Sequence, residues 1–236
     1  MGIHGSIYMK ITSLISGAIL IAILSSCSVT SKVSNDVTYT SNSFSVKALN
    51  DGGLSLLPVV AGSGVEGYRR PFGDRMNAVG DSLLNNFKDW NETLQTLNDE
   101  DLVPEYNSAI QSYQQTGIVD KTLLEKMAEA TGNNYFLYVQ LGSPTSEKDY
   151  DYDMWSGYLS ESETNAISAF ALIWGAKEGD IVWEGYASAE VTTDEFTYTK
   201  ESDFDRAQKV AESLMESVYT TRSYINPAGL NRPNRQ

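Results

Sequence analysis

The sequence predicts an α/β (α+β) fold, in which a mixed β-sheet of about four to five strands carries helices mainly on one face. Three observations lead to this class. Residues 135–141 are apolar on both faces, as in a central strand. Residues 166–176 and 181–192 are two long strand patterns, and the turn sequence at 177–180 joins them as a hairpin. Apolar residues at helical spacing occur before and after these strands.

The first elements of the predicted domain follow from a short apolar run and its neighbours. Residues 54–60 are bounded by glycine pairs and predict a buried strand. Pro58 within this run has no N–H to donate, which favours an edge position or a β-bulge. A helix is expected to start from an N-cap at Asp74. Residues 92–97 are a weaker strand candidate.

The remaining helices are predicted from capping residues and periodicity. Two helices are expected over 104–115 and 120–131, and Gly132 ends the second. A last helix over 203–219 is apolar along one face. The predicted element order is β-α-β-α-α-β-β-β-α. Helices before the hairpin can then cover one face of the sheet, and the last helix packs beside them.

The composition excludes several kinds of active site. Cys27 and His4 are the only cysteine and the only histidine of the chain. A chain without them has no imidazole to activate a nucleophile and lacks the usual zinc ligands. The formal net charge of −14 opposes nucleic-acid binding, which needs basic residues to neutralise phosphates. We therefore expect a protein that is not an enzyme, requires no metal or cofactor and binds no nucleic acid.

The N-terminal segment has the features of a secretory signal. Lys10 precedes an apolar run over residues 11–24, which is too short for a comfortable membrane span. The run ends in four residues that resemble the lipobox of bacterial lipoproteins, namely Leu24, Ser25, Ser26 and Cys27.

This resemblance implies how the chain is processed. Residues 1–26 would be removed as the signal peptide, and Cys27 would carry the lipid that anchors the protein to the membrane. Ser28 stands where an aspartate would favour the inner membrane, so the resemblance implies the outer membrane and its periplasmic face. Met9 is an alternative start to Met1.

The composition also predicts the domain organisation. Residues 27–50 are expected to form a lipidated Ser/Thr-rich tether, since half of residues 28–45 are serine or threonine. Alternating apolar residues in this segment leave an alternative open, an edge strand added to the domain or to a neighbour. Residues 51–220 would form a single α/β domain, and 221–236 a flexible C-terminal tail.

Three sequence segments carry a resemblance to a known family. They are LSLLPVV at 54–60, NNYFLYVQLGS at 133–143 and SAFALIWGAKEGDIVWEGYASAEV at 168–191. In this order they resemble periplasmic lipoproteins built on the TolB N-terminal or CsgG-like α/β module. The resemblance implies a hairpin before a closing helix and a role as an assembly, scaffold or secretion-accessory subunit. It brings no catalytic residues with it.

One predicted loop concentrates basic and aromatic residues. Arg69 and Arg70 are adjacent in an acidic chain, and Tyr68 and Phe72 flank them, which makes the loop a candidate contact for an acidic partner or a glycan. The alternative is a solvated loop whose arginines pair with nearby carboxylates. Residues 62–67 also fit G-x-G-x-x-G, but the distance to the predicted helix favours an ordinary loop over a dinucleotide site.

An acidic, tyrosine-rich loop is predicted after the central strand. Four aromatic residues give it a candidate contact face for a protein or a sugar: Tyr150, Tyr152, Trp155 and Tyr158. Packing of these rings onto the sheet is the alternative. Asp149, Asp151 and Asp153 have the spacing that opens a calcium loop, but the glycine and glutamate expected further on are absent. Calcium binding is left open, with a solvated loop favoured.

These observations lead to three functional hypotheses. The first is an outer-membrane-anchored periplasmic lipoprotein that acts as a non-enzymatic subunit, with a protein partner or with copies of itself. The second is a lipoprotein that binds glycan or peptidoglycan. The third is a hydrolase using Glu184 and Glu190, but these lie roughly 20 Å apart along one strand face. Catalytic carboxylate pairs lie within about 10 Å of each other.

Overall fold

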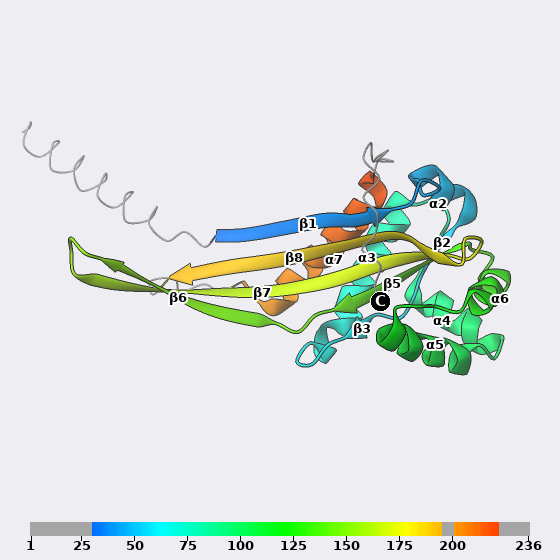
Figure 1. Cartoon of the computed structure of the whole chain (residues 1–236), viewed down its shortest axis with the longest axis horizontal. Coiled ribbons are helices and arrows are strands. Elements are labelled where there is room, and N and C mark those ends of the chain that lie inside the picture. The colour runs from blue at the N-terminus through cyan, green and yellow to red at the C-terminus, as the bar shows by residue number, and fades with distance from the viewer. Residues whose placement is uncertain (1–29, 195–200, 222–236) are drawn as a thin grey trace, which may run out of the picture. The chain divides into compact units, whose positions relative to one another are not determined.

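The computed structural model describes residues 30–194 and 201–221 (Figure 1). Contacts between residues divide the chain into two compact units. Of the described residues, the larger unit contains 33–145, 166–190 and 202–221, and the smaller unit contains 30–32, 146–165, 191–194 and 201.

The predicted α/β (α+β) class is confirmed. The described elements, in chain order, are β1 (Thr30–Thr40), α2 (Val46–Gly52), β2 (Leu54–Leu56), β3 (Val60–Ala61), η1 (Glu66–Tyr68), α3 (Arg69–Leu83), β4 (Phe87–Lys88), α4 (Trp90–Asp99), α5 (Val103–Thr116), α6 (Lys121–Thr131), β5 (Tyr135–Leu141), β6 (Thr145–Asp153), β7 (Tyr158–Gly175), β8 (Asp180–Asp194) and α7 (Asp203–Thr220).

The sheet is mixed, with the strand order β1-β8-β7-β5-β2-β4. Strand β5 pairs parallel with β2 and β3 on one edge and antiparallel with β7 on the other. Strand β4 pairs parallel with β2. Strand β1 is held at the edge by side chains as well, since Ser34 bonds Ser188 at 2.8 Å and the Thr38 hydroxyl donates to Glu184 at 2.9 Å.

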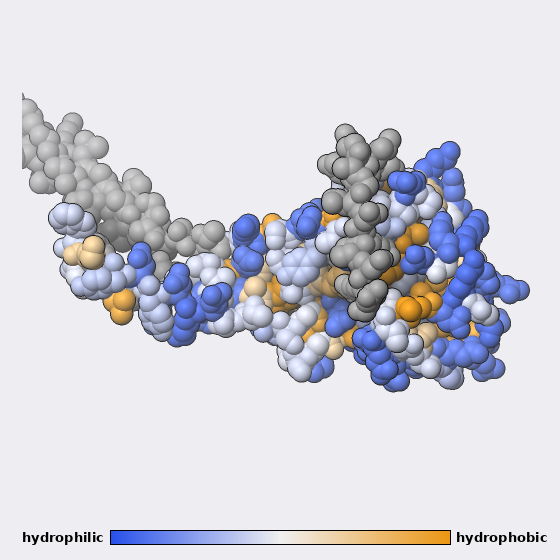
Figure 2. Space-filling view, viewed as in Figure 1, coloured by the Kyte–Doolittle hydropathy of each residue, from blue (hydrophilic) through white to orange (hydrophobic). Residues whose placement is uncertain are grey.

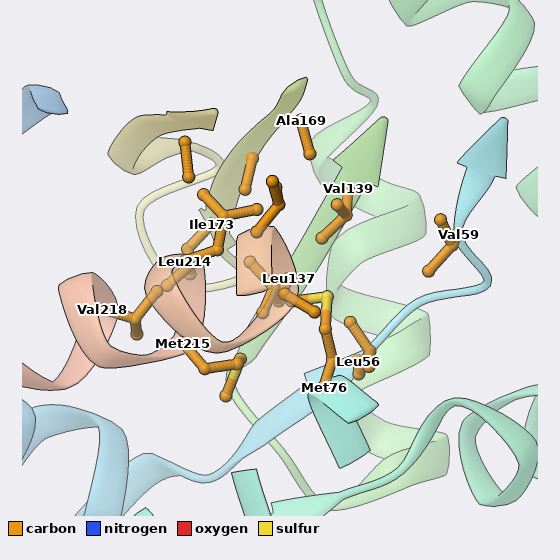
Figure 3. Packing of buried hydrophobic residues seen from close by; sticks show 14 of the residues in the cluster. Leu56, Val59, Met76, Leu137, Val139, Ala169, Ile173, Leu214, Met215 and Val218 are labelled. Atoms are coloured by element: carbon orange, nitrogen blue, oxygen red, sulfur yellow. The ribbon is translucent and has the colours of Figure 1, made fainter. Parts of the chain in front are cut away.

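The side chains of β5 alternate between two apolar cores. Leu137 and Val139 lie in the first core with residues of α3 and α7, part of which Figure 3 shows. Phe136 and Tyr138 lie in the second core with residues of α5 and α6. Helices were predicted mainly on one face, but they cover both, because a strand that is apolar on both faces needs an apolar cover on each.

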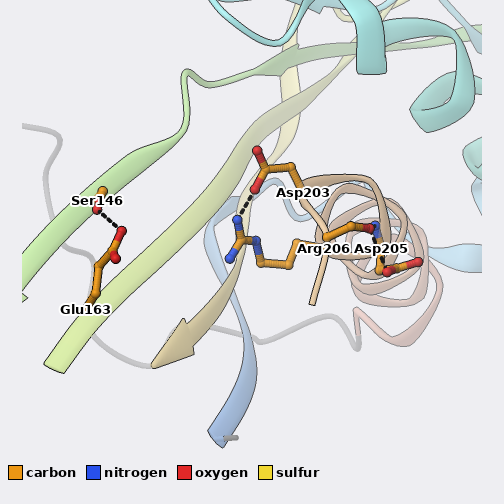
Figure 4. A network of polar contacts seen from close by, with 6 residues as sticks. Ser146, Glu163, Asp203, Asp205 and Arg206 are labelled. Atoms are coloured by element: carbon orange, nitrogen blue, oxygen red, sulfur yellow. Dashed lines mark hydrogen bonds and ion pairs between the residues drawn. The ribbon is translucent and has the colours of Figure 1, made fainter. Parts of the chain in front are cut away.

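The ends of several helices follow from local capping. Asp120 caps α6 by accepting the Thr122 N–H at 2.8 Å, and Gly132 ends this helix in the left-handed conformation, as predicted. Ser202 caps α7 by accepting the Asp205 N–H at 3.1 Å. One turn into α7, the buried Arg206 pairs with Asp203 (Figure 4).

Two predicted element assignments are wrong. Residues 92–97 form the middle of helix α4 and not a strand, because Asp89 caps the helix and Leu97 is buried against α5 and α6. Helix α3 begins at Arg69, and the predicted cap Asp74 lies inside it.

The predicted tether is also corrected by the structure. Residues 30–40 form strand β1, which is the edge-strand alternative, and residues 46–52 form helix α2. Ser45 caps α2, and Phe44 and Leu49 are buried in the first core. A composition rich in serine and threonine is compatible with a strand when a neighbouring strand supplies backbone partners.

A β-bulge interrupts the strand that contains Pro58. Leu56 faces Leu137 in β2, whereas Val60 faces Gln140 in β3, so four residue steps oppose three on β5. In a regular strand, residues two apart point to the same face, and the extra residue shifts this alternation by one. Leu57 therefore points into the second core, whereas Val59 points into the first. The prediction of an edge or a bulge at Pro58 is therefore confirmed.

The smaller unit contains a two-stranded hairpin made by β6 and the first part of β7. The Ser146 hydroxyl donates to Glu163 at 2.9 Å (Figure 4), and Lys148 pairs with Glu161. The structure thus forms strands where the sequence predicted an acidic loop, since the cross-strand pairs compensate for the low strand propensity of aspartate.

We predict that Asp89→Ala lowers the free energy of unfolding by about 1 kcal/mol, because the cap that accepts the Glu92 N–H is lost. Asp99→Ala at the other end of α4 is the matched control. It removes a carboxylate from the negative end of the helix dipole and should not destabilise the protein. Urea denaturation followed by circular dichroism measures both, and equal effects would contradict the capping role.

Candidate functional site

A cleft of about 550 Å³ opens beside the bulge in the larger unit. Its floor is the edge strand from Pro58 to Ala61, and helix α5 forms one wall with Tyr106, Asn107, Ile110, Gln111 and Gln114. Glu66 and Arg69 complete the lining. The volume lies within the range of ligand-binding sites in proteins. A cleft between α5 and α6 is smaller, and its Lys126 and Glu105 already pair with each other at 3.2 Å.

Tyr106 is the most deeply buried polar side chain of this cleft. Helix α5 begins with Pro104 in its first turn and ends at Gly117 in the left-handed conformation, and it turns Tyr106 and Ile110 towards the second core. Tyr106 is 5% exposed, and its hydroxyl is not one of the fully enclosed, unpartnered polar atoms of the described chain.

Electrostatics keep the Tyr106 hydroxyl protonated. Burial raises the pKa of this phenol well above its ordinary value of 10.0, and the neighbouring Tyr138 raises the pKa further. Arg69 lowers the pKa in part, which indicates that its positive charge lies near the phenol. Tyr106 is therefore a neutral hydrogen-bond donor.

The predicted basic loop is divided by the fold. Phe72 is fully buried in the first core and presents no contact surface, which corrects its place in the predicted patch. Tyr68 is half-buried against the same core. Arg69 lines the cleft, whereas Arg70 is exposed and lies 3.9 Å from Asp74, one turn along α3. Helix α3 starts early enough to point these residues in different directions.

The aromatic residues of the hairpin are exposed, as predicted for a contact face. The exposed fractions are 56% for Tyr150, 59% for Tyr152, 98% for Trp155 and 45% for Tyr158. Met154, beside Trp155 at the tip, is 84% exposed. This exposure excludes the alternative, in which the rings pack onto the sheet.

The hairpin has two chemically different faces. Because Ser146 contacts Glu163 and Lys148 contacts Glu161, even-numbered residues of β6 share a face with odd-numbered residues of β7. Tyr150, Tyr152 and Leu159 therefore lie on one face, and Glu147, Asp149 and Asp151 lie on the other. The surface in Figure 2 is mostly hydrophilic along these strands.

The sequence also offered a metal site, a dinucleotide site and a carboxylate pair as candidates. The described residues contain no group of three side chains placed to hold a metal ion. The G-x-G-x-x-G segment at 62–67 lies closer to a helix than the sequence predicted, because η1 begins at Glu66 and α3 at Arg69. Glu184 accepts a hydrogen bond from Thr38 between neighbouring strands.

The lipobox residues Leu24 to Cys27 lie outside the described residues. In the part of the chain that is described, no helix has both the length and the apolarity needed to cross a membrane.

The solved structures that are similar to this chain include three with different names. The PelC dodecamer from Paraburkholderia phytofirmans has a TM-score of 0.36 at 10% identity over 82% of this chain and 100% of that chain. Lipoprotein GNA1162 from Neisseria meningitidis has 0.33 at 13% identity over 71% and 98%. The LpoB C-terminal domain from Salmonella enterica has 0.33 at 14% identity over 61% and 90%. No family model and no curated protein matches the sequence.

Several residues of the cleft cannot be recognised from the sequence. Tyr106, Gln111 and Gln114 belong to the predicted helix 104–115, but nothing local distinguishes them from surface residues. Pro58 was the available signal, because a proline inside a strand pattern often marks a bulge, and bulges occur beside functional sites.

We predict that Tyr106→Phe makes stability less sensitive to alkaline pH. The folded state holds the phenol proton to a higher pH than the unfolded state, so stability falls once pH rises past the unfolded pKa of about 10. Removing the hydroxyl removes this contribution. Urea denaturation at a series of pH values between about 8 and 11 measures it. A decline as steep as that of the wild type would contradict the raised pKa.

Proposed function

We propose that the protein is a lipid-anchored outer-membrane lipoprotein that faces the periplasm and acts as a non-enzymatic assembly, scaffold or secretion-accessory subunit. The observation that carries this proposal is the exposed tip of the hairpin, where Met154 and Trp155 are 84% and 98% exposed. Exposing large apolar side chains to water is unfavourable in free energy unless a partner covers them.

The anchor rests on the sequence. The apolar run after Lys10 and the four-residue motif ending in Cys27 supply the signal and the acylation site. Several acyl chains on one residue hold a protein on a membrane essentially permanently, since each buried methylene contributes about 0.8 kcal/mol. One solved structure similar to this chain is itself described as a lipoprotein.

The non-enzymatic role rests on the side-chain inventory. The mature chain would have neither histidine nor a free thiol, because His4 lies in the signal and Cys27 carries the lipid. The remaining carboxylate pair, Glu184 and Glu190, is too widely spaced along its strand for hydrolysis. Recognition is therefore the role that the exposed aromatic residues favour, with a protein partner or a second copy as the occupant.

A second function is supported by the tyrosines alone. Tyr150 and Tyr152 lie on one face of β6 at a separation of roughly 7 Å along the strand. Two rings at this spacing form a platform on which a sugar chain stacks. Glycan or peptidoglycan binding would use this face and not the apolar tip.

We expect Cys27→Ala to abolish incorporation of radiolabelled palmitate, because the thiol that carries the lipid is gone. Ser28→Asp is the matched variant. It keeps the label but moves the protein from the outer-membrane to the inner-membrane fraction of a sucrose gradient. Labelling of the Cys27→Ala protein would refute the anchor.

Replacing Met154 and Trp155 with serine should leave the free energy of unfolding within about 0.5 kcal/mol of wild type, since both side chains are exposed. The same change should abolish photo-crosslinks from a benzophenone amino acid placed at Tyr152 in living cells. Ile118→Ser is the control, because Ile118 is 71% exposed in the other unit. Crosslinks that survive the tip variant would contradict the proposal.

Sedimentation with purified cell-wall sacculi separates the two functions. Retention that is lost on replacing Tyr150 and Tyr152 with alanine, but kept in the tip variant, would establish the glycan function instead of the protein-partner function.

A further inference from the structure

We propose that the cleft beside the bulge binds the C-terminal end of an extended peptide, which pairs its backbone with the open edge of β3 and places its carboxylate at Arg69. The cleft lies in the larger unit, so this inference does not depend on the hairpin or on the proposed function.

The first argument is the open strand edge. Gly62 donates its N–H to the Leu141 carbonyl at 2.8 Å, and β3 pairs with β5 in parallel register. In such a ladder alternate residues face the partner strand, so Ala61 directs its N–H and C=O away from β5. Neither group has a hydrogen-bond partner in the part of the chain that the structure describes. An added strand would satisfy both groups.

The edge is open because the neighbouring strand is short. Strand β4 pairs with β2 only at Phe87 and Lys88, and the chain then enters helix α4. The bulge at Pro58 separates β3 from β2, and beyond this point no strand among the described residues lies on the outer side of β3. The cleft occupies this position, with Val60 and Ala61 in its lining.

The second argument is the position of the Tyr106 hydroxyl. Tyr106 is a buried residue of the cleft lining, and its hydroxyl is not one of the fully enclosed, unpartnered polar atoms of the described chain. A carbonyl or carboxylate of a ligand in the cleft can accept a hydrogen bond from it. The amide groups of Asn107 and Gln111 add further donors along the same wall of α5, where Gln114 already donates to the Tyr138 hydroxyl at 3.4 Å.

The third argument is charge. Helix α3 carries three arginines, and two of them are already paired, Arg70 with Asp74 and Arg75 with Glu212. Arg69 has no ion pair in the described chain, and it is the cation of the cleft lining. Glu66 is the one acid of the lining, and the amide side chains of the lining both donate and accept hydrogen bonds. A peptide that ends in one carboxylate matches this set, with the carboxylate at Arg69 and the peptide groups at the amides.

The test uses the full chain in detergent micelles. The probes are a pool of random hexapeptides, labelled with fluorescein at the N-terminus and free at the C-terminus, and the same pool with a C-terminal amide. Fluorescence anisotropy measures binding. We expect the acid pool to bind about tenfold more tightly than the amide pool, as a hydrogen-bonded charge contact should give.

Matched variants assign this difference to the cleft. Arg69→Gln should abolish the preference for the acid pool, whereas the neighbouring Arg70→Gln should retain it. Tyr106→Phe, which removes only the hydroxyl, should weaken binding about threefold to tenfold. Ala61→Pro removes the outward N–H without affecting the Gly62 bond to β5, and it should weaken both pools.

Three results would overturn the inference. The first is equal affinity for the acid and the amide pool, and the second is an equal loss of the acid preference in Arg69→Gln and Arg70→Gln. The third is that an oligogalacturonate, a chain of acidic sugars, binds in a way that depends on Arg69 whereas the peptides do not bind. The double serine variant of Met154 and Trp155 should bind the acid pool as wild type does. Failure here and failure of the hairpin function are therefore distinguishable.

Discussion

Strand β5 is hydrogen-bonded along both edges and buried on both faces, and the larger unit is organised by this constraint. Its backbone pairs with β2 and β3 on one side and with β7 on the other. Its side chains feed two cores, so helices must cover each face. Burying one large apolar side chain contributes about 1.5–3 kcal/mol, which makes an uncovered face of such a strand untenable.

The same constraint on β5 determines where the β-bulge lies. Because β5 continues without interruption, the extra residue is accommodated on its partner, where Pro58 has no N–H to lose from the ladder. The bulge shifts the alternation and separates β3 from β2. With β4 ending at Lys88, the outer edge of β3 is left beside α5 and not beside another strand. The cleft is thus a consequence of where the regular sheet ends.

The smaller unit is held together on a different principle. In β6, acidic residues and tyrosines alternate, and the tyrosines of the one face are exposed, so neither face of the hairpin is buried in an apolar core. Cross-strand contacts of the kind that join Lys148 to Glu161 stabilise it instead, and these exposed contacts are individually weak. An element built in this way keeps its aromatic side chains at the surface. It is therefore suited to recognition and contributes little to the core.

The sequence by itself determined the elements whose signals are local: β5 from its two apolar faces, α6 from the caps Asp120 and Gly132, and the turn between β7 and β8. It also determined the side-chain chemistry that is available. Tertiary structure alone decided what depends on distant partners. Strand β1 exists because β8 supplies its hydrogen bonds, and Phe72 is buried because α3 packs on the sheet. Arg69 and Tyr106 line the same cleft because helices α3 and α5 both border it, and no local sequence pattern predicts that these two residues lie together.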